Sequence, residues 1–404
     1  MDWLRAAKTE VVVAAVLASA VVWAGTASGV QTSSGAPEAA AAGKAYQMVK
    51  MDDAKFREWL DAWGRNIVND ARNRYCDKAM GEDIGWLMTP FLDGFYHGYV
   101  ATKDPKWAAM LVDWADSWIA RAVQEPDGYV GWPKVGAAGT QVDSLDDFNA
   151  DSLLGEAMAL RPIVLMAGEI LRTPALKEQY GAKAQSYLDL SERIFEKWEA
   201  RGAWRDTENG GGITVVLPFG LNATGNAWTP GYETRNAPGK GFSHPNNKAN
   251  HVARWLLAMS DVTAKPLYRD RAEKWFRLMK SRMSLTDSGT YRIWNYWEPA
   301  GPWDYKPDGS TKHWVGVHPR AGYYSIDTQG IVDAFEHGLV FTQGDIDRLV
   351  AAALAEKRYW AALVPYNAEI QKHFEDGVEP ASWGGLGAAP WYLALQARLR
   401  EGGR

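Results

Sequence analysis

The chain has 404 residues, a formal net charge of −5 and a single cysteine. The absence of any lysine- and arginine-dense block argues against a nucleic-acid surface, although basic groups concentrated in a cleft would still suit a polyanionic ligand. Because Cys76 stands alone, no disulfide forms within the chain, and packing has to supply the stability.

The first 50 residues predict export. Arg5 and Lys8 precede an apolar run over residues 11 to 24, which suits a signal peptide and is short for a membrane span. Residues 1–27 are therefore expected to be a signal peptide or an uncleaved anchor, the one segment that would contact a membrane. Residues 28–50, rich in alanine, glycine and serine, predict a flexible linker. A single domain over 51–404, in the periplasm or outside the cell, is expected to follow.

Apolar residues then recur at helical spacing along most of the chain. The pattern predicts pairs of helices joined by short Pro- or Gly-containing turns, such as Asp104-Pro105, where aspartate caps the second helix. The predicted helices cover residues 54–75, 86–101, from 105 onward, 152–172 with a partner ending near 198, 245–262 with 268–283, 327–341 with 345–360, and 386–399.

Repeated helical hairpins predict an all-α (α/α) toroid, an incomplete barrel in which each hairpin buries its apolar face against its neighbours. A solenoid is the competing architecture. Two long segments, 201–240 and 284–324, favour the toroid because loops of that length in a compact domain usually carry function. Each contains a predicted strand, at 213–217 and 290–297, and both are expected to rim one mouth of the ring.

The chain contains 21 tryptophans, and several fall in predicted loops. Aromatic faces suit sugar rings, whose C–H groups pack on them while the hydroxyls hydrogen-bond outward. The alternative is that these side chains pack the loops onto the body. The loop tryptophans are Trp132, Trp228, Trp294, Trp297, Trp303 and Trp314.

The predicted helix 245–262 is the centre of the functional prediction. Ser243 is expected to cap it and Pro245 to occupy its first turn. One face is apolar, and the other carries Asn247, Asn250, His251 and Arg254. Amides, an imidazole and a guanidinium bind carboxylates and move protons near neutral pH, so this face is expected to be functional and not merely solvated.

Common catalytic and cofactor motifs are absent, including nucleotide-binding loops, HExxH and GxSxG. The histidines at 244, 251, 313 and 318 lack compact metal-ligand spacing. No cofactor is expected, and a structural metal is left open.

Asn250-His251 followed by Val-Ala-Arg-Trp255 resembles the Asn-His helix of the alginate-lyase-type polysaccharide lyases, which use an (α/α) toroid. In that family an arginine and a tyrosine follow at the start of a later helix. His318-Pro-Arg320-Ala-Gly-Tyr-Tyr324 is the best match here. The resemblance implies β-elimination on an acidic polysaccharide such as alginate or glucuronan, leaving a 4,5-unsaturated uronate.

The resemblance also implies roles for four residues: Asn250 neutralises the uronate carboxylate with help from Arg320, His251 is the base or a carboxylate partner, and Tyr324 is the acid or both acid and base. The Arg-to-Tyr spacing is shorter than the family pattern. Arg292 and Tyr296 are therefore rival candidates, and Tyr323 is not separated from Tyr324. The expected substrate contacts are Asn247, Arg254, Arg292, Tyr296, His318, Tyr323, Trp294 and Trp228.

Two other functions remain open from the sequence. An inverting glycoside hydrolase on the same toroid needs only two carboxylates across the site. A non-catalytic glycan-binding envelope protein would bind the same sugars without changing them. In every case we expect a monomer with no nucleic-acid partner, while the polymer and the internal or terminal position of cleavage stay undetermined. The candidate acids for hydrolysis are Asp143, Asp146, Asp147, Asp151, Glu298 and Asp304.

Overall fold

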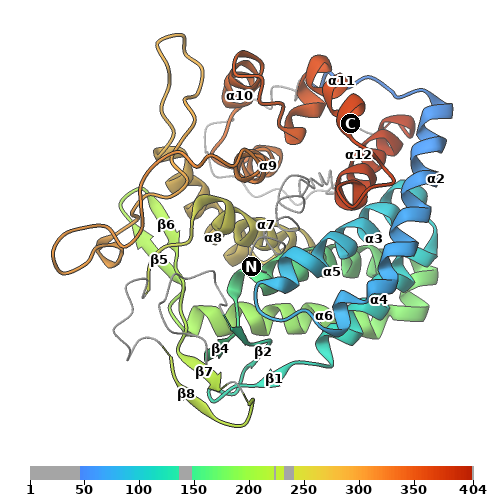
Figure 1. Ribbon diagram of the computed structural model, residues 1–404. Coiled ribbons are helices and arrows are strands. Elements are labelled where there is room, and N and C mark those ends of the chain that lie inside the picture. Colours follow the sequence, from blue (N-terminus) through green and yellow to red (C-terminus); the bar gives the residue numbers. More distant parts are fainter. Residues whose placement is uncertain (1–45, 136–147, 223, 232–240, 403–404) are drawn as a thin grey trace, which may run out of the picture.

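Helices arranged in an incomplete ring make up most of the computed structural model, which describes residues 46–135, 148–222, 224–231 and 241–402 (Figure 1). The inner helices are α3 (Thr89–Thr102), α5 (Leu153–Arg172), α7 (Asn246–Thr263), α9 (Gly322–Glu336) and α12 (Gly385–Arg400). The outer helices are α2 (Asp53–Asp70), α4 (Pro105–Ile119), α6 (Pro174–Ala200), α8 (Pro266–Ser281) and α10 (Gln343–Ala355).

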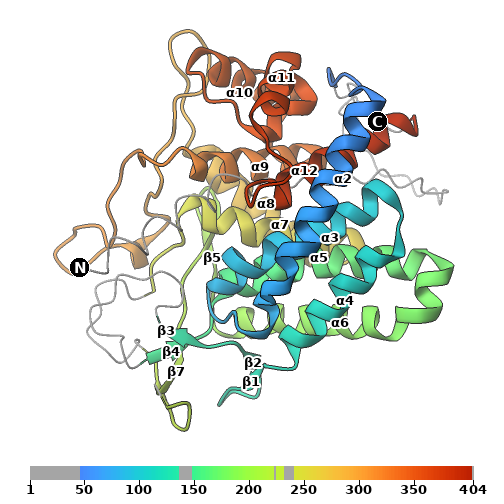
Figure 2. The ribbon, with the colours of Figure 1, turned by 45° about the vertical axis from the view of Figure 1, so that its right-hand side comes forward.

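The ring runs α12, α3, α5, α7, α9 through direct helix-to-helix contacts. Between α9 and α12 the short 3₁₀ helix η7 (Ala361–Tyr366) and helix α11 (Ala368–Gly377) fill the remaining side. Phe374 of α11 packs on Tyr392 of α12 with ring centroids 5.0 Å apart. The chain is therefore an incomplete (α/α) toroid of helical hairpins, as its sequence predicts (Figure 2).

The connections differ strongly in length at the two ends of the ring. Inner helices pass to the outer helices that follow them through short connections, of one residue after α5, two after α3 and α7, and six after α9. Asp104 caps α4 as predicted, since its Oδ1 accepts a hydrogen bond from the Lys106 backbone N at 2.9 Å. The returns to α5, α7 and α9 are long, and they lie where the inner helices begin. We call this end of the ring the mouth.

Three small antiparallel sheets form within these long returns (Figure 1). β1 (Val123–Gln124) pairs with β2 (Val130–Gly131), and β5 (Trp204–Thr207) pairs with β6 (Gly210–Ile213). The third sheet has the order β3-β4-β7-β8. Its strands are β3 (Lys134–Val135), β4 (Phe148–Ala150), β7 (Phe219–Asn222) and β8 (Trp228–Pro230).

Both predicted strands need correction. The strand expected at 213–217 lies at Gly210–Ile213, where the sheet approaches α8 so closely that a Cβ on Gly210 would stand 2.2 Å from the Lys274 carbonyl oxygen. Residues 290–297 form only isolated bridges. Their buried side chains, Tyr291, Trp294 and Trp297, recur every third residue, a spacing that does not match the two-residue period of a strand.

The start of two inner helices also differs from the prediction. Pro245 is the N-cap of α7, and Ser243 instead donates from its backbone N (2.6 Å) and its Oγ (2.7 Å) to the Asp304 carboxylate. Helix α9 begins at Gly322, so Tyr323 and Tyr324 belong to its first turn and point in different directions, about 100° apart around the helix.

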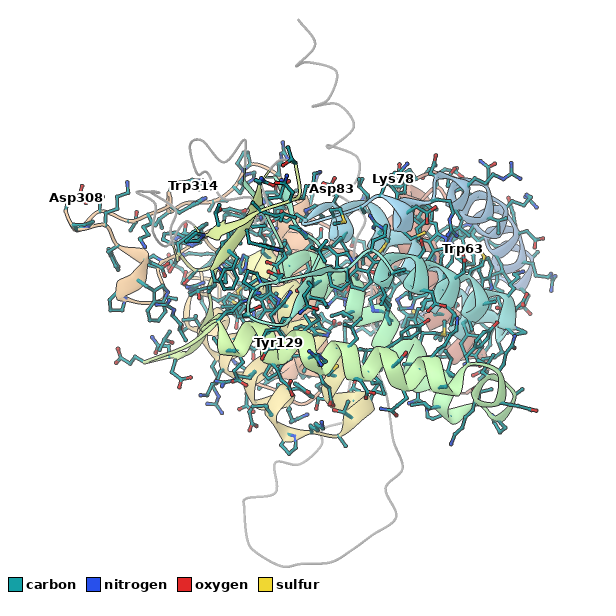
Figure 3. All side chains as sticks on the ribbon, turned by 90° about the horizontal axis from the view of Figure 1, so that it is seen from below. Trp63, Lys78, Asp83, Tyr129, Asp308 and Trp314 are labelled. Atoms are coloured by element: carbon teal, nitrogen blue, oxygen red, sulfur yellow. The ribbon has the colours of Figure 1, made fainter. Side chains whose placement is uncertain are left out.

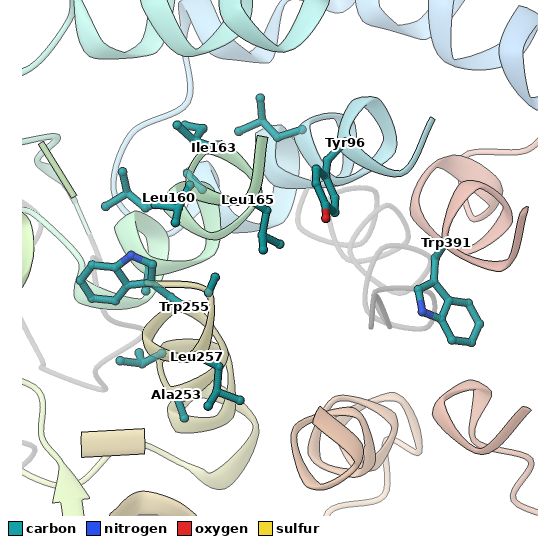
Figure 4. Close-up of a cluster of buried hydrophobic side chains, with 14 of the residues drawn as sticks. Tyr96, Leu160, Ile163, Leu165, Ala253, Trp255, Leu257 and Trp391 are labelled. Carbon is teal, nitrogen blue, oxygen red and sulfur yellow. The ribbon is translucent and has the colours of Figure 1, made fainter. Parts of the chain in front are cut away.

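Most tryptophans pack helices and loops together. Figure 4 shows Trp255 of α7 beside Leu160 and Ile163 of α5, with Trp391 on α12. Trp132, Trp294 and Trp297, which the sequence offered as sugar-binding candidates, are at most 3% exposed and belong to the interior. Trp228 and Trp303 are half-buried, and Trp314 is 43% exposed.

The described residues begin within the predicted linker. Gln47 donates its backbone N to the Pro365 carbonyl at 2.8 Å, and the Tyr46 hydroxyl donates to Glu336 at 2.7 Å, so this stretch lies on the helical body. The predicted signal segment lies outside the described residues. Within the described part of the chain, no helix has the length and apolar character needed to cross a membrane.

A buried ion cluster fixes the start of α5 to the end of α6. The Lys197 ammonium, 0% exposed, lies 2.6 Å from Asp151 and 2.7 Å from Glu156. Arg201 lies 3.0 Å from Glu125 and 3.1 Å from Asp151. Burial raises the pKa of Glu156 to about 7 and that of Glu125 to about 9. Burial opposes ionisation of Asp151 as well, but the two cations hold its pKa below the ordinary value.

Replacing Lys197 by methionine should therefore destabilise the fold by about 3–5 kcal/mol, because buried carboxylates would lose their cation. Chemical denaturation at pH 7 measures the change. Lys265→Met is the matched control, since Lys265 is 54% exposed in its pair with Glu192 and should contribute less than about 1 kcal/mol. Equal effects of the two substitutions would contradict a stabilising role for the buried cluster.

Candidate functional site

The long return before α9 is tied to the first turn of α7 at the mouth. The Asn246 backbone N donates to the Tyr296 carbonyl at 3.1 Å, and the Tyr296 backbone N donates to the Gly316 carbonyl at 2.8 Å. Arg282 donates to the Asn246 side chain at 2.7 Å. These bonds place the Tyr296 side chain next to the start of α7.

Four aromatic side chains gather at this point, and we call them the aromatic cluster: Tyr296, Trp314, His318 and Tyr323. The Tyr296 and Trp314 rings are stacked, with centroids 5.7 Å apart and 15° between their planes. Tyr296 lies 5.2 Å from Tyr323, and Tyr323 lies 4.6 Å from His318. The return and the first turn of α9, which directly follows it, thus combine into one aromatic surface.

Inside the mouth, the inward polar face of α7 carries Asn247 and His251, one helical turn apart. They are 1% and 4% exposed. The Asn247 Oδ1 and the His251 Nε2 have no hydrogen-bond partner among the described residues. Buried polar atoms of this kind normally hold ordered water or a ligand.

Trp86 and Glu82 form a wall beside His251. The Trp86 ring meets the imidazole edge to face at 5.9 Å and packs against Leu154 and Met158 of α5. Glu82 lies 2.8 Å from Lys248. Burial raises the pKa of Tyr296, and the nearby charges of Tyr323 and Glu82 act in the same direction, which brings the wall and the aromatic cluster into one electrostatic environment.

Further along α7 from the mouth, beyond His251, the interior of the ring contains ion pairs. Arg254 lies 2.6 Å from Asp333, and Arg161 lies 2.6 Å from Asp93. Burial, followed by the charges of Arg254 and Arg161, lowers the pKa of His251 well below 6.5. The imidazole is therefore neutral near pH 7, with one N–H donor and one lone pair.

Asn250, predicted to neutralise a carboxylate, lies in a helix-to-helix contact. Its Nδ2 donates to Asp327 Oδ1 at 2.7 Å, and its Oδ1 accepts from Trp275 Nε1 at 2.8 Å. Trp294, predicted to contact substrate, donates its Nε1 to Asp327 Oδ2 at 2.8 Å. Asn250 is 0% exposed, and both its polar atoms are engaged, so its predicted role requires this contact to open.

Tyr324, the predicted acid, is 1% exposed and stacks edge-on against Trp294 at 5.7 Å. Its hydroxyl accepts a hydrogen bond from the His318 backbone N at 2.8 Å. Tyr323 is half-buried within the aromatic cluster, so of these two neighbours it is the one beside the other predicted site residues.

The remaining predicted residues divide between the mouth and other surfaces. Arg320 is exposed close to the aromatic cluster, where its charge lowers the pKa of Tyr296 against the effect of burial. Arg292 is exposed and donates to the Leu285 carbonyl at 3.1 Å. Trp228 lies on β8, the edge strand that pairs with β7, where Leu221 is its partner.

The acids considered for hydrolysis are mostly engaged in structure. Asp304 accepts three hydrogen bonds, from the backbone N and Oγ of Ser243 and from the Ala300 backbone N. Asp151 belongs to the buried ion cluster, and Glu298 accepts from Asn295 at 2.6 Å. Asp143, Asp146 and Asp147 lie outside the described residues.

Several residues inside the ring near His251 were not predicted as site residues from the sequence. Trp86 stands in a π-helical turn, Ile84–Met88, which no apolar period predicts. The buried polar side chains of α3 and α9 occur at helical spacing as Asp93/His97 and Gln329/Asp333, and this pattern was available in the sequence. No group of three or more histidine, cysteine or acidic side chains suited to a metal occurs in the described part of the chain.

No protein-family model and no curated protein matches the chain. It is similar to the solved α-1,6-mannanase GH76A of Salegentibacter sp. HEL1_6, with 11% identity and a TM-score of 0.46 over 84% of this chain and 98% of that one. D-mannose isomerase gives 13% identity and a TM-score of 0.41, over 86% and 97%. The GH76 α-mannanase of Bacteroides thetaiotaomicron gives 13% and 0.40, over 86% and 96%. Scores this low transfer neither a reaction nor a substrate.

The buried Asp327 carboxyl gives a pH-dependent prediction. Burial raises its pKa from 3.8 to about 7, against the opposing hydrogen bonds of Trp294 and Asn250. A carboxyl whose folded pKa is raised loses stabilising free energy as the pH rises from about 4 to about 7, on the order of a few kcal/mol. Asp327→Asn lacks this titration and leaves one N–H donor without an acceptor.

The destabilisation caused by Asp327→Asn should thus be largest near pH 4 and level off above about pH 7, measured by urea denaturation across that range. Asp287→Asn, on a fully exposed side chain of the same return, should show no such trend. A pH-independent difference between wild type and Asp327→Asn would show that Asp327 ionises near its ordinary pKa.

Proposed function

We propose that the protein is an enzyme that binds a glycan at the mouth of the ring and cleaves a glycosidic bond there. The observation that carries the proposal is the joining of the aromatic cluster to the first turn of α7, whose next inward side chains, Asn247 and His251, hold unpartnered polar atoms. Flat aromatic surfaces bind sugar faces, while buried, convergent polar atoms orient hydroxyls and transfer protons.

Hydrolysis is the reaction we favour. Elimination by the predicted set would require Asn250 and Tyr324, and both make hydrogen bonds inside the protein and are buried. Hydrolysis requires two carboxylates, one as acid and one as base. The sequence supplies Asp143, Asp146 and Asp147 as candidate acids, and these three lie outside the described residues. Among the described carboxylates, Glu82 belongs to the wall beside His251, where it accepts a hydrogen bond from Trp86 Nε1 at 3.4 Å.

β-Elimination on an acidic glycan is the second candidate. It is favoured by the neutral His251, whose unpartnered Nε2 suits proton abstraction, and by the exposed Arg320 near the aromatic cluster. In this version His251 is the base and Tyr323 replaces Tyr324 as the acid, because Tyr323 lies in the aromatic cluster.

The two reactions are separated by their products. Purified protein is incubated with α-mannan, xylan, alginate, glucuronan, pectate and glycosaminoglycans, and reducing ends and ultraviolet absorbance are followed together. Hydrolysis raises reducing ends alone, and elimination also raises the absorbance of a 4,5-unsaturated uronate. Asp146→Asn or Asp147→Asn should abolish hydrolysis, whereas Tyr323→Phe should abolish elimination. Binding of a glycan with no product of either kind would leave a non-catalytic binding protein.

If the reaction is elimination, His251→Ala should lower kcat/KM by about 100-fold or more, the usual loss when a proton-transferring group is removed. If it is hydrolysis, the loss should be smaller, because two carboxylates transfer the protons and His251 only orients the sugar. His373→Ala is the matched control, since His373 is exposed and stacks on Tyr359 at 4.0 Å, outside the mouth. Full activity of folded His251→Ala would remove His251 from the mechanism.

A further inference from the structure

We infer that the aromatic cluster continues outward as a platform for a long glycan, so that the substrate is a polymer bound across several sugar units. This inference rests on the proposed function and deepens it by naming the substrate class. It is carried by Trp314, labelled in Figure 3, which is 43% exposed and stacked on Tyr296. Tyr296 is itself in contact with Tyr323.

The exposure of Trp314 stands out among the tryptophans of this protein. Nine others in the described residues are fully buried, and Trp314 is the one tryptophan among the large exposed apolar side chains. Val315 and Val317 beside it are 47% and 49% exposed. Exposed apolar surface rimmed by polar groups usually marks a binding site.

The platform is held rigidly, which reduces the entropy lost on binding. Gly316, between the two exposed valines, accepts a hydrogen bond from the Tyr296 backbone N and pairs with Trp297, a fully buried residue whose Nε1 donates to the Ser243 carbonyl at 2.8 Å. The His318 backbone N is bonded to the Tyr324 hydroxyl. A Cβ on Gly316 would stand 3.0 Å from the Trp314 indole, so this glycine leaves room for the ring.

The four rings form one compact group and not a line. Trp314 is 5.7 Å from Tyr296 and 5.8 Å from His318, and both of these rings contact Tyr323 in the first turn of α9. Trp314 is the exposed member of the group, while Tyr296, His318 and Tyr323 are half-buried. A glycan extending past the reacting unit would place its outer units on Trp314.

Chain-length dependence tests the inference. Trp314→Ala should raise KM at least tenfold on the polymer that the wild type cleaves, and the loss of kcat/KM on the polymer should be several times the loss on the shortest cleaved oligosaccharide. Trp314→Phe should recover most of the loss. Leu285→Ala, at a side chain 44% exposed in the same return, is the matched control and should change neither substrate.

Equal losses on polymer and oligosaccharide, or no loss on either, would overturn the platform while leaving the proposed function standing. If the wild type cleaves nothing, affinity electrophoresis of the same variants in gels containing each polysaccharide decides the matter. Retardation of wild type that Trp314→Ala loses supports the platform and refutes the enzyme, and no retardation of wild type refutes the platform.

Discussion

The hydrogen bond between Asn250 of α7 and Asp327 of α9 is the interaction on which the arrangement of the mouth depends. Both side chains are buried, and each has a second partner: Trp275 of the outer helix α8 bonds Asn250, and Trp294 of the long return bonds Asp327. A buried carboxylate is costly unless its oxygens accept hydrogen bonds, so the four groups have to stay together. Together they align the outer helix α8, the inner helices α7 and α9, and the long return. Gly330 allows α9 to approach α7 closely, since a Cβ at this position would stand 2.8 Å from Asn250 Oδ1.

The site follows from that alignment. Because Trp294 fixes the return and α9 begins at Gly322, the return brings Tyr296 to the first turn of α7 while α9 supplies Tyr323. The inner helices supply groups of a different kind. Their axial charges lie in pairs, Arg254 with Asp333 and Arg161 with Asp93, and the atoms without a partner are Arg254 Nη2 and those of the neutral His251 imidazole and Asn247 amide. An aromatic surface at the rim and neutral polar atoms inside fit a sugar better than they fit a multivalent ion.

The spacing of apolar residues was sufficient to predict the helical hairpins. Each helix buries one face, and this requirement determines the residue pattern within that helix alone. The residue pattern also predicts a functional role for α7, because its polar face lacks the lysines and glutamates of a solvated helix. The same reasoning went wrong at residues 290–297, where aromatic residues suggested a strand. The return is shaped by what it packs against, namely Asp327, Ser243 and Asp345, and none of these lies nearby in the sequence.

By itself, the sequence therefore determined the helices, their pairing into a ring and the helix that carries the polar face. Tertiary structure alone decided which members of that face are available: both polar atoms of Asn250 are taken by Asp327 and Trp275, while Asn247, His251 and Arg254 each keep an unpartnered atom. It also decided that Trp294 is internal and Trp314 external. The physical reason is that helical periodicity reports which side of a helix is polar, whereas availability to a ligand depends on partners contributed by other helices, dozens of residues away.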